Sequence, residues 1–241
     1  MTNISFCNVE SLFFKQLAAE GYEITDIADE IFNPLRGEIR KYRTAYERLR
    51  QLADEGDKSA LCFAPRIFIW YLQNTEWPYT PETEMKYNEQ GVAQGLPLCV
   101  LNKSYSYQHG ESGYPKDLNE AHQLALKAAS AGLYGGQRFL LNEYWQKLGV
   151  IDYRYKDNDL PIIRKALCWG RLAAHHSNHS FGADLRGFTG SLSTASRQKN
   201  DQSKLIHPEL EQLSDDWDIG TTPYEQKPTT VQDCLNIEKE N

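Results

Sequence analysis

The stretch Asp117–Tyr144 constrains the fold of this chain more than any other. Small or apolar residues recur in it at intervals of three and four and end at a glycine: Ala121, Leu124, Ala128, Ala129 and Gly132. This spacing places them on one face of an α-helix that stops at Gly132. A second series, Gly136, Leu140 and Tyr144, follows with a spacing of four. The stretch therefore predicts two antiparallel helices joined by a glycine turn.

The same pattern recurs along the chain. The turn position is occupied by Gly56, Gly95, Gly132 and Ser177, which are 39, 37 and 45 residues apart. Further repeat positions around these anchors hold small or aromatic residues, namely Ala45, Gly110, Gly113, Ala166, Trp169 and Ala173. A period of this size built from helix pairs is typical of an α-solenoid. We therefore predict an all-α fold, a short right-handed solenoid of four to five helical hairpins.

The third unit carries a family resemblance. Its residues run Tyr107-x-x-Gly110-x-x-Gly113-Tyr114-x-x-Asp117, and then Lys127-Ala128-Ala129-x-x-Gly132-x-x-x-Gly136-Gln137. This order resembles the Sel-one-like repeat (SLR) family, close relatives of the tetratricopeptide repeat, over about residues 40–188. The second unit departs from the family pattern, because Glu84 replaces its leading alanine. The resemblance implies a curved stack of helical hairpins that binds other proteins, with no shared active site.

Three regions are predicted: a capping hairpin over residues 1–35, helical repeats over 36–190, and a polar linker with an acidic tail over 191–241. Residues 1–200 hold 23 acidic and 23 basic side chains, whereas residues 201–241 hold 10 acidic and 3 basic. The whole net charge of −7 therefore lies in the tail. We expect a short helix over 205–218 to cap the last repeat. The remainder is either a solubilising extension or a segment that occupies a basic groove.

Candidate protein-binding residues lie in two loops and in the tail. Insertions in repeat arrays map to loops on one face, often the binding face, and tyrosine, tryptophan and arginine are favoured interface anchors. The longest connection inside the repeats covers residues 147–161, and a Pro-rich loop covers 74–81. The candidates are Trp77, Tyr79, Tyr153, Arg154, Tyr155, Asp215, Asp216 and Asp218. An ordinary solvated loop is the competing interpretation of residues 147–161.

Catalytic and metal-binding signatures are weak. His175, His176 and His179 form an H-H-x-x-H cluster, and histidines four apart share a helix face as metal ligands do. The predicted turn at Ser177 interrupts that helix, so we interpret the cluster as structural. Sequence motifs of nucleophilic or phosphate-binding sites are missing. We expect no enzyme activity, no cofactor and no bound metal. The basic residues between Arg36 and Arg50 alternate with acids, which favours a salt-bridged helix over a nucleic-acid site.

The cysteines and the N-terminus favour the cytoplasm. The five cysteines, Cys7, Cys62, Cys99, Cys168 and Cys234, are scattered without a C-x-x-C pair. We interpret them as reduced and mostly buried thiols. The first residues have no basic n-region followed by a signal-peptide h-region. No run of about eighteen apolar residues is present, so we expect no membrane segment.

Together these features predict a protein-binding repeat protein. A small SLR-like chain with an unusual loop and an acidic tail resembles bacterial immunity proteins, which bind and neutralise a cognate interbacterial toxin. A basic cleft on such a toxin would suit an acidic tail. A general adaptor or regulatory scaffold is the alternative, and a metal-dependent enzyme built on the histidine cluster is the third.

Overall fold

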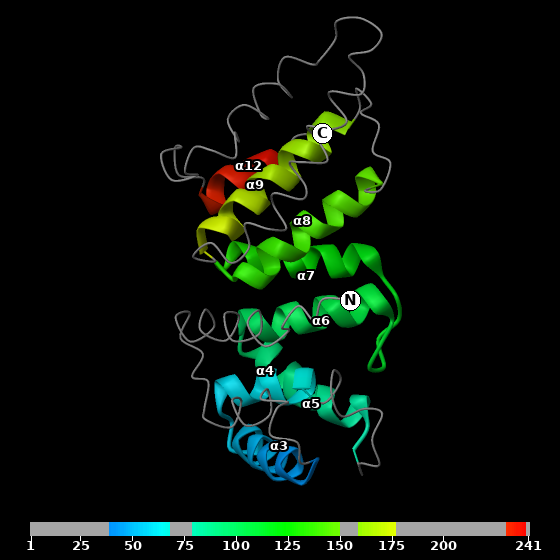
Figure 1. Cartoon of the computed structure of the whole chain (residues 1–241), viewed down its shortest axis with the longest axis vertical. Coiled ribbons are helices and arrows are strands. Elements are labelled where there is room, and N and C mark those ends of the chain that lie inside the picture. The colour runs from blue at the N-terminus through cyan, green and yellow to red at the C-terminus, as the bar shows by residue number, and fades with distance from the viewer. Residues whose placement is uncertain (1–38, 68–78, 150–158, 177–229, 240–241) are drawn as a thin grey trace, which may run out of the picture. The chain divides into compact units, whose positions relative to one another are not determined.

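The structure is a computed structural model, and it describes residues 39–67, 79–149, 159–176 and 230–239. All secondary structure in these residues is helical, which confirms the all-α prediction for this part of the chain. The helices, labelled in Figure 1, are α3 (Ile39–Asp54), α4 (Lys58–Ile67), α5 (Pro81–Ala93), α6 (Pro97–His109), α7 (Leu118–Ser130), α8 (Tyr134–Leu148), α9 (Leu160–His176) and α12 (Val231–Glu238). None of these helices is long and apolar enough to cross a membrane.

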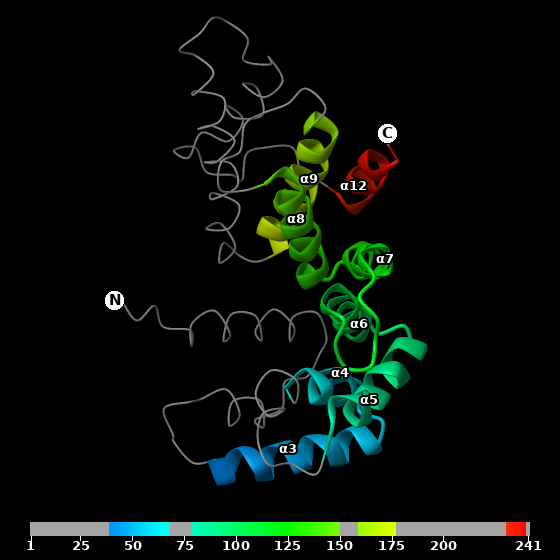
Figure 2. The same ribbon diagram turned by 90° about the vertical axis from the view of Figure 1, so that its right-hand side faces the viewer.

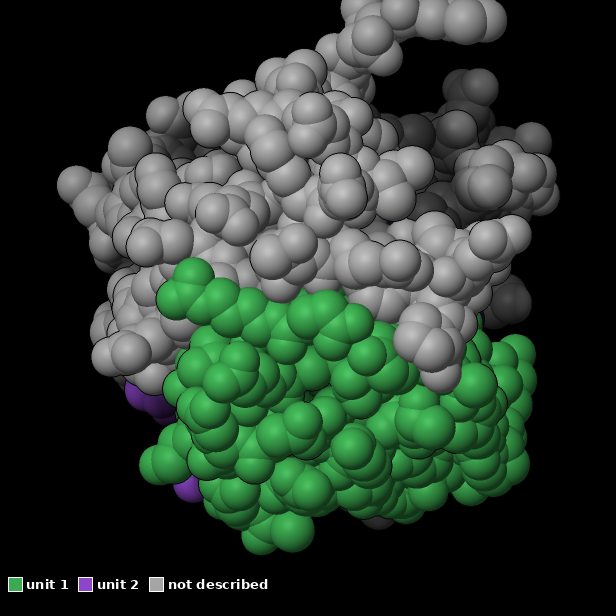
Figure 3. Space-filling view, turned by 90° about the horizontal axis from the view of Figure 1, so that it is seen from below, with its two compact units in different colours: residues 1–133 green, residues 134–241 purple. Residues whose placement is uncertain are grey.

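The chain divides into two compact units, which are coloured separately in Figure 3. Unit 1 covers Met1–Leu133 and unit 2 covers Tyr134–Asn241. The division falls inside the predicted repeat region, directly after the Gly132 turn. The expected pairing of the helices on either side of Gly132 stays a prediction, because these helices belong to different units.

Three helix ends have the same turn geometry. Gly56, Gly95 and Gly132 have φ angles of +86°, +75° and +89°, a left-handed conformation that favours glycine. At each turn the residue after the glycine donates its N–H to a carbonyl five residues earlier. These bonds run from Asp57 to Leu52 at 2.9 Å, from Leu96 to Gly91 at 3.0 Å and from Leu133 to Ala128 at 3.1 Å. The recurring glycines thus end α3, α5 and α7 in one way.

Side-chain caps determine where α5 and α7 begin. Thr80 precedes α5 and forms a capping box with Thr83, while Pro81 occupies the first turn. Asp117 precedes α7, and its carboxylate accepts from the backbone N–H groups of Asn119 and Glu120. An aspartate here satisfies donors that have no partner within the helix.

Helices that are consecutive in the chain pack on one another within unit 1, from α3 to α7. Figure 2 shows α4 and α5 beside each other, between α3 and α6. The core between them is apolar, and small side chains reach complete burial alongside large ones. Its members include Leu49, Ala53, Ala60, Leu61, Leu98, Leu101, Ala121, Ala125, Ala128 and Ala129. Removing such side chains from water is the main stabilising contribution to a fold of this kind.

Unit 2 is built from α8, α9 and α12, and α9 packs against each of the other two. Its core includes the repeat positions Tyr144, Ala166, Trp169 and Ala173, of which Trp169 is fully buried. Residues 231–238 fall in the predicted acidic tail, yet they form a helix. The predicted capping hairpin over 1–35 and the predicted helix over 205–218 lie outside the described residues.

Candidate functional site

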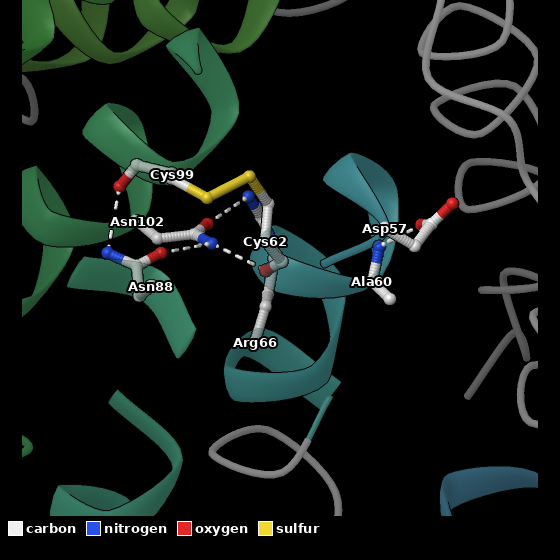
Figure 4. Close-up of a disulfide and its surroundings, with 7 residues drawn as sticks. All are labelled: Asp57, Ala60, Cys62, Arg66, Asn88, Cys99 and Asn102. Carbon is white, nitrogen blue, oxygen red and sulfur yellow. Dashed lines mark hydrogen bonds between the residues drawn. A yellow bond between two sulfur atoms is a disulfide. The ribbon is translucent and has the colours of Figure 1, made fainter. Parts of the chain in front are cut away.

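A disulfide inside unit 1 corrects the prediction of reduced thiols. Cys62 on α4 and Cys99 on α6 are bonded, with their Cα atoms 4.8 Å apart, and both are completely buried (Figure 4). The prediction was wrong because the two cysteines, which form no C-x-x-C pair, are joined across two helices at a sequence separation of 37. Cys62 follows Gly56 by six residues and Cys99 follows Gly95 by four. The two cysteines therefore occupy early turns of the second helices in successive hairpins, where a bond is within reach.

Two buried asparagines surround this disulfide. Asn102 donates from Nδ2 to the carbonyl of Cys62 at 2.7 Å and to Oδ1 of Asn88 at 3.1 Å. Asn88 donates in turn to the carbonyl of Cys99 at 2.9 Å, as Figure 4 shows. Arg66 donates to Oδ1 of Asn102 at 3.2 Å. The amides are satisfied at fully or almost fully buried positions, which a core polar group requires.

Gly91 makes room for the disulfide. A Cβ added at this position in the interior of α5 would lie 2.0 Å from Sγ of Cys99 and 3.0 Å from its Cβ. A glycine inside a helix costs about 1 kcal/mol relative to alanine. The close approach of Cys99 explains why this position nevertheless holds glycine.

Glu84, which departs from the family pattern, lies at the centre of a buried polar cluster between α3 and α5. Its side chain is completely buried, and its carboxylate accepts a hydrogen bond from the Tyr46 hydroxyl. Arg50 donates from Nε to Oε1 at 3.1 Å. Burial raises the pKa of Glu84, although the bond from Tyr46 and the charge of Arg50 oppose this rise. Burial and the neighbouring Glu84 charge also raise the pKa of Tyr46.

Tyr79 is the only candidate binding residue inside the described residues, and its ring contacts α3. The guanidinium of Arg50 lies 3.6 Å from the ring centroid, within the range of a cation–π interaction. The Tyr79 hydroxyl donates to Glu47, 2.9 Å from its Oε1. Tyr79 thus holds the start of α5 against α3. The other candidates, Trp77, Tyr153, Arg154, Tyr155, Asp215, Asp216 and Asp218, lie outside the described residues.

Unit 2 contains a second disulfide, between Cys168 on α9 and Cys234 on α12, with Cα atoms 5.5 Å apart. One helical turn further along α12, the Glu238 carboxylate accepts from Trp169 Nε1 at 2.7 Å and lies 2.7 Å from the Tyr144 hydroxyl. Burial and the bond to Glu238 raise the pKa of Tyr144. A sequence signal for α12 was present, because Thr230 and Asp233 have the spacing of a capping box.

The histidine cluster lies only partly within the described residues. His175 and His176 fall in the last turn of α9, whereas His179 lies outside the described residues. Among the side chains that the structure describes, no group of three or more His, Cys, Asp or Glu is placed to hold a metal ion.

The described part of the chain is an all-helical protein in which each unit contains one disulfide and one glutamate held by a tyrosine hydroxyl. Comparison with protein-family models, curated proteins and solved structures gave no match. The SLR resemblance therefore stays a prediction.

Proposed function

We propose that this chain is a non-enzymatic helical-repeat protein that binds another protein. The observation that supports the proposal is the common turn at Gly56, Gly95 and Gly132, which is repeated after 39 and 37 residues. Helix pairs that recur at such intervals stack side by side and present extended surfaces to protein partners. Binding, rather than chemistry, is the task that this architecture favours.

The partner that we propose is an interbacterial toxin, which the chain would bind and neutralise as an immunity protein. The support is the charge distribution, since the net charge of −7 lies entirely in residues 201–241. An acidic segment complements a basic active-site cleft and speeds the encounter with it. A general adaptor has no specific observation in its favour.

The two disulfides bear on where this encounter takes place. The sequence favours a cytoplasmic chain, but cytosolic glutathione and thioredoxin keep most thiols reduced. Four of the five cysteines are paired in the structure. We therefore place the working protein in an oxidising compartment, such as a periplasm or the cell exterior.

The test uses the full-length oxidised protein and, as the candidate toxin, the product of a neighbouring gene. We expect stoichiometric binding by calorimetry and loss of toxin activity in the complex. Replacing Asp215, Asp216 and Asp218 by Asn should slow association at low salt, and the difference should shrink as the Debye length falls from about 10 Å at 0.1 M salt to about 3 Å at 1 M.

The matched control removes the same charge from the body, at the exposed residues Glu55, Glu111 and Glu120, and should slow association less. Binding without inhibition would favour an adaptor. Absence of binding, with the two disulfides intact, would reject this toxin as the partner.

A further inference from the structure

Helix α12 is too short to be stable alone. It spans eight residues, Val231–Glu238, and isolated helices shorter than about 12–15 residues are marginal in water. It lies beside α9 in Figures 1 and 2, although residues 177–230 separate the two helices in the chain. Its order must therefore come from its contacts with α8 and α9.

Two side chains on one face of α12 supply these contacts. Cys234 is the helix's one fully buried residue, and Glu238 follows four residues later, so both project from the same side. Cys234 is bonded to Cys168. Lys165 adds to the attachment of Glu238, since its Nζ lies 3.9 Å from the carboxylate and 3.2 Å from the Glu238 carbonyl.

The receiving site is built from buried donors. Trp169 is 0% exposed and Tyr144 is 4% exposed, and each is within 2.7 Å of the Glu238 carboxylate. When α12 is away, the indole N–H of Trp169 and the Tyr144 hydroxyl lose this charged acceptor. Hydrogen bonds to a charged group contribute more than neutral ones. The donors thus favour the seated helix, and the disulfide keeps the carboxylate beside them.

We propose that Cys168 and Cys234 are an oxidative modification site, and that closing their disulfide seats α12 against α8 and α9. The oxidant is a disulfide, either in a thiol–disulfide oxidoreductase or in glutathione disulfide. The Cys234 thiolate attacks one oxidant sulfur and forms a mixed disulfide, and the other oxidant sulfur leaves as a thiolate. The Cys168 thiolate then attacks the Cys234 sulfur and releases the second oxidant thiolate. Two electrons pass from the cysteine pair to the oxidant, which becomes the dithiol of the oxidoreductase or two molecules of glutathione.

This order of attack follows from the positions of the two cysteines. Cys234 belongs to a short helix near the C-terminus that has little stability before it is seated, so its sulfur is accessible to the oxidant. Cys168 lies in the middle of α9, and it is 6% exposed. The disulfide of unit 1 differs, because Cys62 and Cys99 are only 37 residues apart and lie on α4 and α6, which are longer helices than α12.

Hydrogen–deuterium exchange on the full-length protein tests the proposal. In the oxidised protein we expect the amides of residues 234–238 to be protected. The Cys234→Ser variant should lose at least tenfold of that protection without any reductant, while α8 and α9 stay protected. Gln232→Ser, at an exposed position of the same helix, is the control and should exchange as the wild type does. Equal protection of α12 in Cys234→Ser and wild type would overturn the proposal.

A redox titration gives a second readout that does not depend on removing a cysteine. Glu238→Gln loses the charge-assisted bonds but keeps both thiols. In glutathione buffers we expect its Cys168–Cys234 equilibrium to shift about tenfold towards the thiols, because seating and disulfide formation are coupled. The Cys62–Cys99 equilibrium in the same sample is the internal control and should not move. An unshifted Cys168–Cys234 equilibrium would show that disulfide formation does not depend on the contacts of Glu238.

Discussion

The two units are held by the same kinds of interaction, but over different lengths of chain. In unit 1 the disulfide joins cysteines 37 residues apart, and Glu84 connects neighbouring hairpins through Tyr46 and Arg50. In unit 2 the disulfide spans 66 residues, and Glu238 brings the end of the chain back to α8 and α9. Unit 1 is therefore stabilised by contacts between helices that are near in the chain, whereas unit 2 depends on a segment that is distant in the chain.

Removing each disulfide gives the largest expected effect. Replacing Cys62 and Cys99 by Ala should lower the free energy of unfolding of unit 1 by about 4 kcal/mol, because the unfolded chain loses a constraint on its entropy. Replacing Cys168 and Cys234 should cost unit 2 about as much or slightly more, since its loop is longer. Guanidinium unfolding without reductant measures both. A loss below about 1 kcal/mol in either double variant would contradict a stabilising role for that disulfide.

Truncating the two glutamates should give the next largest losses of stability, and the loss should be larger in unit 1 than in unit 2. Glu84→Ala leaves Arg50 without its carboxylate in a buried cluster, and we expect a loss of about 3 kcal/mol. Glu238→Ala should cost less, about 1–2 kcal/mol, because the Glu238 side chain retains 10% exposure whereas that of Glu84 has none. Urea unfolding of the oxidised variants gives the comparison. The reverse order would mean that burial does not set the strength of these contacts.

Gly91 tests how closely unit 1 is packed around its disulfide. Gly91→Ala should cost about 2 kcal/mol, because the new methyl group would meet Cys99 Sγ. In the Cys62→Ala/Cys99→Ala background the sulfur is gone, so the same substitution should cost much less. The difference between the two thermal unfolding measurements is the coupling energy. No coupling would place the Cys99 sulfur away from Gly91.

The smallest expected effect is a pH dependence from Glu84. Its pKa in the folded state is raised above the ordinary value of 4.5, so the folded protein binds this proton more tightly than the unfolded chain does. The stability that Glu84 contributes is therefore greatest below pH 4.5 and decreases as pH rises through the folded pKa. Relative to Glu84→Gln, the wild type should lose stability between pH 4 and pH 7. A wild type that gains stability over this range would show that Arg50 and Tyr46 outweigh burial.

The sequence predicted the local structure of unit 1 well, for a physical reason. Glycine positions and helix periodicity are local properties, and the predicted turn positions Gly56, Gly95 and Gly132 each follow a helix of the structure within two residues. The disulfides are not local, and their pairing depends on which helices pack together. Glu84 was noticed as a departure from the repeat pattern, but its partners Tyr46 and Arg50 lie more than thirty residues away.

The C-terminal helix was missed for a related reason. Val231, Cys234 and Leu235 have helical spacing, but the segment is only eight residues long. Its main anchors are a cysteine and a glutamate that bind residues of α8 and α9. Net charge indicated a solvated tail, since Glu238 was counted there among the acids. Only the positions of Tyr144 and Trp169 reveal that this carboxylate is partly buried.

Peptide mapping under non-reducing conditions tests whether each unit contains its own disulfide. The full-length protein is alkylated in the native state, digested and analysed by mass spectrometry before and after reduction. We expect one cross-linked peptide pair containing Cys62 and Cys99 and another containing Cys168 and Cys234, with these four cysteines alkylated only after reduction. Alkylation of any of the four in the native protein, or cross-links between the two pairs, would contradict the account.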